Sequence, residues 1–245
     1  MNILVTNDDG LSSEGLQVLA SALSRDHDVW IVAPSMNRSG VSHGITMDEP
    51  LRFKQSGPKE FSCTGLPVDC SITGSQGIMP CIPDAIVSGI NRGANLGTDI
   101  VYSGTAAAAR QASFAGIPGI AVSLVSKTDE YLWQPLAGFI RDNLSALLSL
   151  CARDVFVNVN APSISAYAGV RMTGVSRRDY RDSILMHDGP DGCKYSFFRG
   201  GDIQTDGDEK SDFEAVESGC VSISRIASQP FALEPDAGQA RLFRL

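Results

Sequence analysis

The chain has 245 residues, of which 43% are hydrophobic and 20% are charged, and this composition is typical of a globular protein. Its length fits one large α/β domain, or one domain with an arm, because domains usually contain about 100–200 residues. The 28 acidic residues outnumber the 20 basic ones, for a net charge of −8. This balance disfavours binding to nucleic-acid polymers, which requires clustered Lys and Arg. A soluble enzyme or a ligand-binding protein remains.

Leader and membrane segments are not expected. The N-terminus, MNILVTNDD, has no basic residue and becomes polar directly after Val5, so it lacks the pattern of a signal peptide. No uninterrupted apolar run approaches the roughly 18 residues that a membrane helix needs. The six cysteines are scattered without a CxxC pair, and a chain of this length needs no disulfide framework. We therefore expect a cytoplasmic protein with reduced thiols and no membrane partner.

Strand patterns and helix patterns alternate through the first two thirds of the chain. Apolar runs typical of buried strands occur at residues 2–6, 28–33, 84–87, 117–124 and 155–159. Helices are predicted, from apolar spacing or composition, at about 13–23, 67–74, 105–115 and 131–150. A small hairpin is expected before Cys63. Alternation of this kind predicts a doubly wound, Rossmann-like three-layer α/β sandwich with a mostly parallel sheet.

The pattern of strand- and helix-forming residues changes beyond Pro162. Residues 170–175 and 219–226 have strand patterns, but residues 188–212 between them are rich in Gly and Asp, and no long helix pattern returns. We therefore predict a Rossmann-like catalytic domain over residues 1–165. Residues 166–245 are predicted to form a β-rich C-terminal extension or arm that takes part in subunit assembly.

Three polar segments follow predicted strands, where ligands bind in open α/β sheets. They are NDDG at 7–10, NRSG at 37–40 and SGINRGANLG at 88–97, and the last of them is predicted to form a glycine-rich loop. The adjacent carboxylates of Asp8 and Asp9 repel each other, so a functional site there requires a cation or a raised pKa. Side-chain oxygens of Ser39 and Asn91 would complete an all-oxygen set of ligands, which favours Mg²⁺, Mn²⁺ or Ca²⁺ over zinc.

Each of these segments also has a purely local interpretation. An NDDG sequence after a strand is often only a turn, since Asn, Asp and Gly suit turns. Ser103-Gly104-Thr105 is either an ordinary helix cap or a phosphate seat at a helix N-terminus. The glycines of the 88–97 segment are four residues apart and do not match GxGxxG, which speaks against an NAD-dependent oxidoreductase. His43 is either a general acid or a solvated loop residue, and one His without a partner favours the second.

Several segments together resemble the SurE (survival protein E) family. They are TNDDG at 6–10, NRSG at 37–40, the G-x-P-x-D-C pattern at 65–70, SGINRGANLGTDIVYSGTAAAA at 88–109 and GIPGIAVS at 116–123. Ser211-Asp212-Phe213, followed by GCVSIS at 219–224, is similar to the C-terminal pattern of that family. The similarity spans most of the chain in the right order, and the block at 88–109 is highly specific.

The resemblance implies a metal-dependent phosphatase of nucleoside 5′-monophosphates, with 3′-nucleotidase and exopolyphosphatase activity in some members. It implies a homodimer or homotetramer formed by exchange of segments. One divalent cation per subunit, Mg²⁺ or Mn²⁺, would be held by Asp8, Asp9, Ser39 and Asn91, and the two aspartates would be catalytic. Phosphate contacts are expected from Asn95, Ser103, Gly104 and Thr105. Arg92 departs from the family, where small residues are common, and either contacts phosphate or faces solvent.

Two questions stay open at the level of sequence. The attacking group is either a water that one aspartate orients or an aspartate itself, through an aspartyl-phosphate. The main alternative to an enzyme is a regulatory protein that binds nucleotide and metal without turnover.

Overall fold

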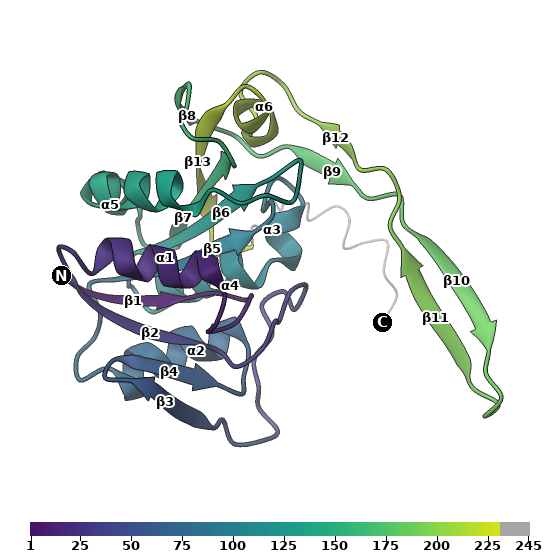
Figure 1. The fold of residues 1–245 in the computed structure, drawn as a ribbon, viewed down its shortest axis with the longest axis horizontal. Coiled ribbons are helices and arrows are strands. Elements are labelled where there is room, and N and C mark those ends of the chain that lie inside the picture. Colours follow the sequence, from purple (N-terminus) through teal and green to yellow (C-terminus); the bar gives the residue numbers. More distant parts are fainter. Residues whose placement is uncertain (231–245) are drawn as a thin grey trace, which may run out of the picture.

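One nine-stranded sheet forms the centre of the computed structural model, which describes residues 1–230 (Figure 1). The strand order is β3-β4-β2-β1-β5-β6-β7-β13-β8. The strands are β1 (Asn2–Thr6), β2 (Asp28–Pro34), β3 (Phe53–Gly57), β4 (Glu60–Cys63), β5 (Ala85–Arg92), β6 (Gly119–Val125), β7 (Val155–Pro162), β8 (Gly169–Met172) and β13 (Cys220–Ala227). Neighbouring strands are parallel except at β3 with β4 and at β13 with β7. The predicted Rossmann-like α/β fold is therefore confirmed.

Helices cover both faces of the sheet. Helices α1 (Glu14–Leu23) and α5 (Trp133–Leu150) pack together on one face, and α2 (Pro67–Thr73) and α4 (Gly104–Phe114) pack on the other. The alternation of β1 shows why both faces need cover, because Ile3 and Val5 belong to the core on the α1 side and Leu4 to the core on the α2 side. Among the described residues, none of the helices is both long and apolar enough to cross a membrane.

Helix α4 approaches the sheet unusually closely. Ser103 caps it, since its Oγ accepts a hydrogen bond of 3.0 Å from the backbone N–H of Ala106. The helix then presents alanines with no exposed surface to the sheet, among them Ala109. A Cβ atom added to Gly119 of β6 would lie 2.1 Å from the carbonyl oxygen of Ala109. Small residues on both elements therefore bring the N-terminus of α4 close to the end of the sheet that carries the candidate site.

The glycine-rich segment differs from its prediction as a loop. Its first five residues continue β5 as far as Arg92, and pairing with β6 resumes at Asn91 and Ser123 after a register shift. Gly89 lies within this shift at a φ of 140°. A Cβ atom there would lie 2.3 Å from the carbonyl oxygen of Val122. Close packing of the two strands therefore requires glycine at this position, and the residue does not mark a loop.

Two antiparallel ribbons project from the body as an arm (Figure 1). The first pairs β9 (Arg177–Asp179) with β12 (Gln204–Asp206), and the second pairs β10 (Ser183–Asp188) with β11 (Lys194–Arg199). The chain then returns through α6 (Asp212–Glu217) to β13 in the main sheet. The boundary at residue 165 stays a prediction, and residues 231–245 of the predicted extension lie outside the described residues.

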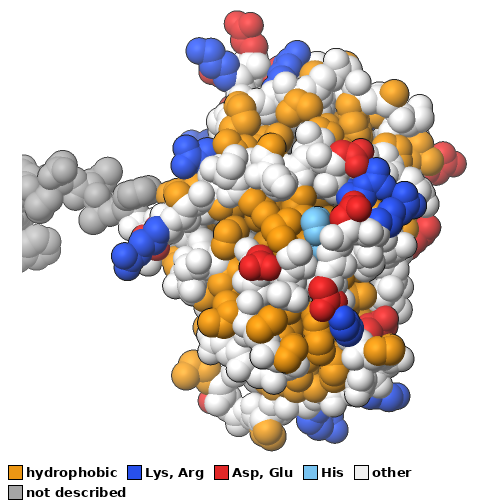
Figure 2. All heavy atoms as spheres, turned by 90° about the vertical axis from the view of Figure 1, so that its left-hand side faces the viewer, with side chains coloured by type: hydrophobic (Ala, Val, Ile, Leu, Met, Phe, Trp, Pro, Cys, Tyr) orange, Lys and Arg blue, Asp and Glu red, His pale blue; other side chains and the backbone are white. Residues whose placement is uncertain are grey.

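Figure 2 shows the side of the molecule that lies on the left in Figure 1, away from the arm. Acidic and basic side chains form small separate groups there, among apolar and neutral ones. The candidate site lies toward the other side, because β1 starts near the N-terminus and runs toward the side from which the arm projects (Figure 1).

Candidate active site

The candidate site lies where the strand order reverses. From β1 the chain passes to β2 and β4 on one side of the sheet, and then to β5, β6 and β7 on the other side. The carboxyl ends of β1 and β5 therefore flank a crevice of the kind that binds ligands in such folds. Asp8 and Asp9 follow β1 directly, and Asn91 and Arg92 end β5.

The turn after β1 is made by residues other than the two aspartates. The Asn7 amide donates to the Gly10 carbonyl at 3.1 Å and to the Ser13 hydroxyl at 2.6 Å, and it accepts from the Gly10 N–H at 3.2 Å. Gly10 has a φ of 104°, which favours glycine. The turn thus leaves the carboxylates of Asp8 and Asp9 for other partners.

Asp8 is a buried carboxylate with neutral hydrogen-bond partners. Its side chain is 3% exposed, and it accepts from the Thr105 N–H at 3.1 Å and from the Thr105 hydroxyl at 2.5 Å. Burial, with a smaller contribution from the charge of Asp9, raises its pKa from 3.8 to about 6, although the bonds from Thr105 lower it. A carboxylate in this environment is suited to a cation that neutralises it.

Asp9 is half-buried and bonds to the end of β5. Its Oδ2 accepts from the backbone N–H of Arg92 at 2.9 Å. Burial raises the pKa of Asp9, and the backbone bond and charge of Arg92 partly offset this. The Arg92 guanidinium lies over the Tyr131 ring at 5.1 Å, and its side chain is 60% exposed. The sequence alone left open whether Arg92 contacts phosphate or faces solvent. In the structure its side chain is largely exposed to solvent and also contacts an aromatic ring.

A cavity of about 210 Å³ brings together most of the predicted site residues. Its lining includes Asp8, Ser39, Asn91, Asn95 and Ser103. The Asn91 amide nitrogen donates to the Gly93 carbonyl at 3.0 Å, which leaves its oxygen for a ligand. The Ser39 hydroxyl donates to Asn37 at 2.7 Å, so its oxygen retains lone pairs. The donor set around the cavity is therefore an all-oxygen one. No group of three or more His, Cys, Asp or Glu side chains suited to a metal occurs among the described residues, so any site here must use hydroxyl and amide oxygens.

The four predicted phosphate contacts divide into two pairs. Asn95 and Ser103 line the cavity. Asn95 is fixed there by its amide, which donates to the Ser123 hydroxyl at 2.8 Å. Gly104 and Thr105 lie beside Asp8 instead, and a Cβ atom added to Gly104 would lie 2.9 Å from the Cβ of Asp8. The role of all four residues stays a prediction.

We expect Thr105→Val to destabilise the protein mainly when Asp8 is ionised. The variant keeps the volume of the side chain and removes its hydrogen bond to the carboxylate, which costs about 1.5–3 kcal/mol when the acceptor is charged. The loss should be largest above the pKa of Asp8, near 6, and smaller below it. Urea unfolding at a pH on either side of that value measures this. Thr105→Ser, which keeps the hydroxyl, is the control, and an equal loss at both pH values would contradict the expectation.

Residues that the sequence analysis did not select also line the cavity. They are Gly40, Gly93, Ala94, Asp99, Tyr102 and Tyr180. Asp99 and Tyr102 lie inside the block at 88–109, but Tyr180 comes from the base of the arm. No local pattern in the sequence connects residue 180 with Asp8.

His43 does not lie in the cavity beside Asp8. Its Nε2 lies 3.1 Å from the Oε1 of Gln111, and its ring lies 5.7 Å from that of Phe114. Burial lowers the pKa of His43. It does not line the cavity beside Asp8, so the geometry gives no support to a general acid here.

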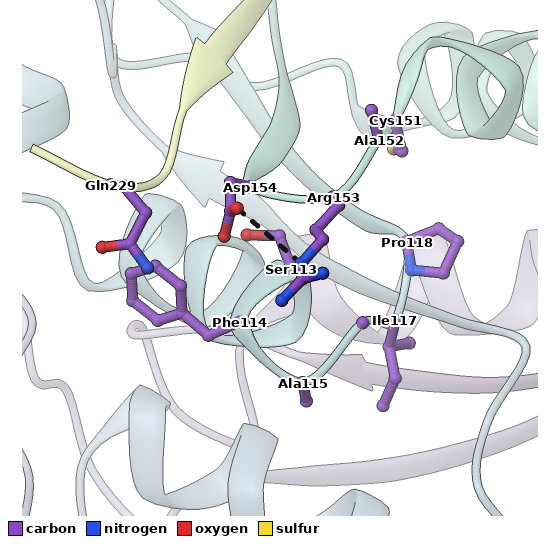
Figure 3. A pocket seen from close by; sticks show the side chains of 11 residues that line it. Ser113, Phe114, Ala115, Ile117, Pro118, Cys151, Ala152, Arg153, Asp154 and Gln229 are labelled. Atoms are coloured by element: carbon purple, nitrogen blue, oxygen red, sulfur yellow. Dashed lines mark ion pairs between the residues drawn. The ribbon is translucent and has the colours of Figure 1, made fainter. Parts of the chain in front are cut away.

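A larger cavity of about 790 Å³ lies at the opposite ends of the strands (Figure 3). Its walls come from the segments before β6 and before β7, with Gln229 on the C-terminal side (Figure 3). Its charged side chains are Arg153 and Asp154, which form an ion pair at 4.0 Å. It therefore offers volume but lacks the group of oxygen ligands found beside Asp8.

Known proteins resemble this chain in sequence and in fold. The family described as "Survival protein SurE" matches residues 3–182. The chain belongs to the SurE family. A relative named 5′-nucleotidase SurE from Thermosipho melanesiensis is 38% identical over 234 residues, covering 93% of this chain and 91% of that protein. One of the same name from Treponema pallidum is 46% identical over 188 residues, covering 73% of this chain and all of that protein. The crystal structure of SurE from Aquifex aeolicus superposes with a TM-score of 0.82 at 31% identity, covering 94% of this chain and 95% of that one.

The region that matches the SurE family contains the segments that form the candidate site. The matched range contains the turn after β1 and the whole block at 88–109. It also reaches the base of the arm, where Tyr180 lies. The residues that line the cavity therefore all lie within the region shared with other SurE proteins.

Proposed function

We propose that this protein is a metal-dependent phosphatase that hydrolyses nucleoside monophosphates to nucleoside and phosphate. The observation that carries the proposal is the buried carboxylate of Asp8, which accepts hydrogen bonds from Thr105 and borders a cavity lined by oxygen ligands. The names of the Thermosipho and Treponema relatives support a 5′-nucleotidase. Activity on 3′-monophosphates and on polyphosphate stays a prediction, as does a cytoplasmic location.

One divalent cation, Mg²⁺ or Mn²⁺, fits this group of residues. Asp8 and Asp9 would contribute carboxylates, Ser39 a hydroxyl and Asn91 an amide oxygen, and hard cations prefer such ligands. The raised pKa of both aspartates supports the fit, because a bound cation would supply the charge that burial leaves uncompensated. When bound, the cation would neutralise charge on the phosphoryl oxygens and make a water more acidic.

The hydrogen bonds of the side chains indicate a different role for each of them in the reaction. Both oxygens of Asp8 already accept from Thr105, so Asp8 is suited to a fixed negative charge. Asp9 has one oxygen bonded to Arg92 and is less buried, so we assign it the orientation of the attacking water. The water oxygen forms a bond to phosphorus and gives up a proton to solvent, the ester P–O bond breaks, and the leaving alkoxide takes a proton from solvent. The N-terminus of α4 and Asn95 would bind the phosphoryl oxygens during this exchange.

Metal binding should weaken at low pH, because the carboxylate of Asp8 becomes protonated there. A cation must displace the proton from a carboxylate, and the pKa of Asp8 is raised to about 6. We expect the dissociation constant for Mn²⁺ to be nearly constant above that pH and to rise by up to about tenfold for each pH unit below it. Isothermal titration calorimetry of metal-free protein measures this. A dissociation constant that stays flat well below the pKa of Asp8 would place the metal elsewhere.

Assembly into a homodimer or homotetramer is proposed from the arm. The β10–β11 ribbon extends from the body (Figure 1), and its exposed side chains include Ile184, Met186, Phe197 and Phe198, the last at 80% exposure. Apolar surface of this kind usually marks an interface. We expect Phe198→Ser to weaken self-association at least tenfold in analytical ultracentrifugation. Ile82→Ser, which removes an apolar side chain with 73% exposure outside the arm, is the control, and equal behaviour of the two variants would contradict this role for the ribbon.

Phosphate release from adenosine monophosphate, with and without added metal, tests the activity itself. Nucleotide binding without release under any divalent metal would favour a regulatory binding protein instead.

A further inference from the structure

The cavity beside Asp8 is too small to enclose a nucleotide. Its volume is about 210 Å³, whereas pockets that bury a drug-sized ligand usually measure about 300–1,000 Å³. The phosphoryl group belongs at the Asp8 end, with the oxygen ligands. The nucleoside must therefore extend across the rim of the cavity, and the residues of that rim decide what is recognised beyond the phosphate.

Two tyrosines from distant parts of the chain form part of this rim. Tyr102 ends the short helix α3 (Asp99–Tyr102), directly before Ser103, and its side chain is 56% exposed. Tyr180 follows β9 at the base of the arm and is half-buried. Both line the same cavity as Asp8 and Asn91. A tyrosine ring offers an apolar face on which any nucleobase can stack.

Tyr180 is held in place by a buried ion pair. Its hydroxyl donates to Asp99, and the Arg178 guanidinium donates to the other oxygen of Asp99 at 2.5 Å. The side chains of Arg178 and Asp99 are only 12% and 7% exposed. The backbone N–H of Arg178 also donates to the Thr98 hydroxyl at 2.9 Å. These bonds fasten the base of the arm to the segment that carries Ser103, so the ring of Tyr180 has a fixed position relative to the oxygen ligands.

We propose that Tyr180 and Tyr102 form a nucleobase subsite at the rim of this cavity, with Asp99 and Arg178 as positioning residues for Tyr180. The proposal rests on the nucleotidase function and deepens it, because it assigns the preference for nucleotides over simpler sugar phosphates to these two rings. The ribose spans the distance between the rim and the phosphate, and the base stacks on tyrosine without being read by hydrogen bonds. Discrimination between bases is therefore weak.

A comparison of two substrates tests the subsite. Adenosine monophosphate and ribose 5-phosphate share the phosphoester, and only the first has a base. For Tyr180→Ala we expect the KM for adenosine monophosphate to rise about tenfold, since stacking on one ring typically contributes at least that factor. The kcat for both substrates and the KM for ribose 5-phosphate should stay within about twofold of the wild type. Tyr180→Phe keeps the ring and should retain most of the preference for the nucleotide.

A second cavity provides the competing location for the base. It measures about 380 Å³, contains Asp9, and is lined by Tyr131 and Trp133, whose rings stack at 5.0 Å. Tyr131→Ala is therefore the matched variant. If it removes the preference for adenosine monophosphate and Tyr180→Ala does not, the proposal is overturned. An equal loss for both substrates in Tyr180→Ala, or no change for either, overturns it as well.

Equilibrium binding separates this proposal from the proposed activity. Calorimetry should show that Tyr180→Ala binds adenosine monophosphate about tenfold more weakly than the wild type does and binds inorganic phosphate equally well. A wild-type protein that releases no phosphate but shows this difference would refute the nucleotidase function and keep the subsite. An active wild-type protein without this difference would refute the subsite alone.

Discussion

Asp8→Asn is expected to reduce kcat/KM for nucleoside monophosphates by about a thousandfold or more, because the charge stabilisation that a metal site contributes is worth several kcal/mol. The amide keeps the shape of the side chain and can still accept from the Thr105 hydroxyl. It removes the negative charge at the centre of the proposed cation site. Phosphate release at saturating Mn²⁺ measures the effect. Asp142→Asn, a change of an exposed carboxylate on α5, is the control and should leave the rate unchanged.

The same variant should be more stable than the wild type when no metal is bound. The folded state raises the pKa of Asp8 from 3.8 to about 6, so ionising it in the folded protein costs free energy that the unfolded chain does not lose. This cost begins as the pH rises above 3.8 and is complete above about 6. A shift of about two pKa units corresponds to about 3 kcal/mol. This value is the upper limit of the gain, because the amide has one acceptor oxygen and leaves the Thr105 N–H without its acceptor. Urea unfolding in EDTA measures it. Loss of activity together with a loss of metal-free stability would show that Asp8 is structural.

Asp212→Ala is expected to lower the free energy of unfolding by at least about 3 kcal/mol, because buried backbone donors lose a charged acceptor. Asp212 is 0% exposed and accepts from the N–H groups of Gly97 at 2.7 Å, Ser176 at 2.8 Å and Phe213 at 2.8 Å. It therefore joins the glycine-rich segment, the base of the arm and α6. Because that segment carries Asn95 and Asp99, activity should fall as well.

Ser211→Ala is the comparison for this effect. The Ser211 hydroxyl accepts from the Glu214 N–H at 3.3 Å as the N-cap of α6, and the loss of such a cap costs about 1 kcal/mol. Thermal or urea unfolding of both variants ranks them. If Asp212→Ala costs no more than Ser211→Ala, the carboxylate does not hold these three segments together.

The sequence was most informative for the site residues that lie at, or shortly after, the end of a strand. Asp8 and Ser39 follow strands that could be recognised from their apolar runs, Asn91 lies at the end of another, and parallel strands bring such ends together. The prediction for Ser88 to Arg92 was wrong because glycine at residue 89 was taken as a loop signal. In the structure it allows β5 to pack against β6.

The contribution of the arm could not be predicted from the sequence. Tyr180 and Arg178 reach Asp99 only because the chain leaves the sheet after β8 and passes over the candidate site. Their local sequence, rich in arginine and aspartate, resembles an ordinary solvated turn. Long-range contacts of this kind depend on the path of the whole chain, which hydrophobic periodicity does not encode.

The most direct test of a metal-dependent phosphatase centred on Asp8 is phosphate release from adenosine monophosphate by protein stripped with EDTA, before and after Mg²⁺ or Mn²⁺ is restored. We predict almost no release from the stripped protein, full recovery with one of the two metals, and no recovery in Asp8→Asn. Unchanged phosphate release from fully stripped protein would contradict the proposed function. So would the absence of phosphate release with every divalent metal from protein shown to be folded.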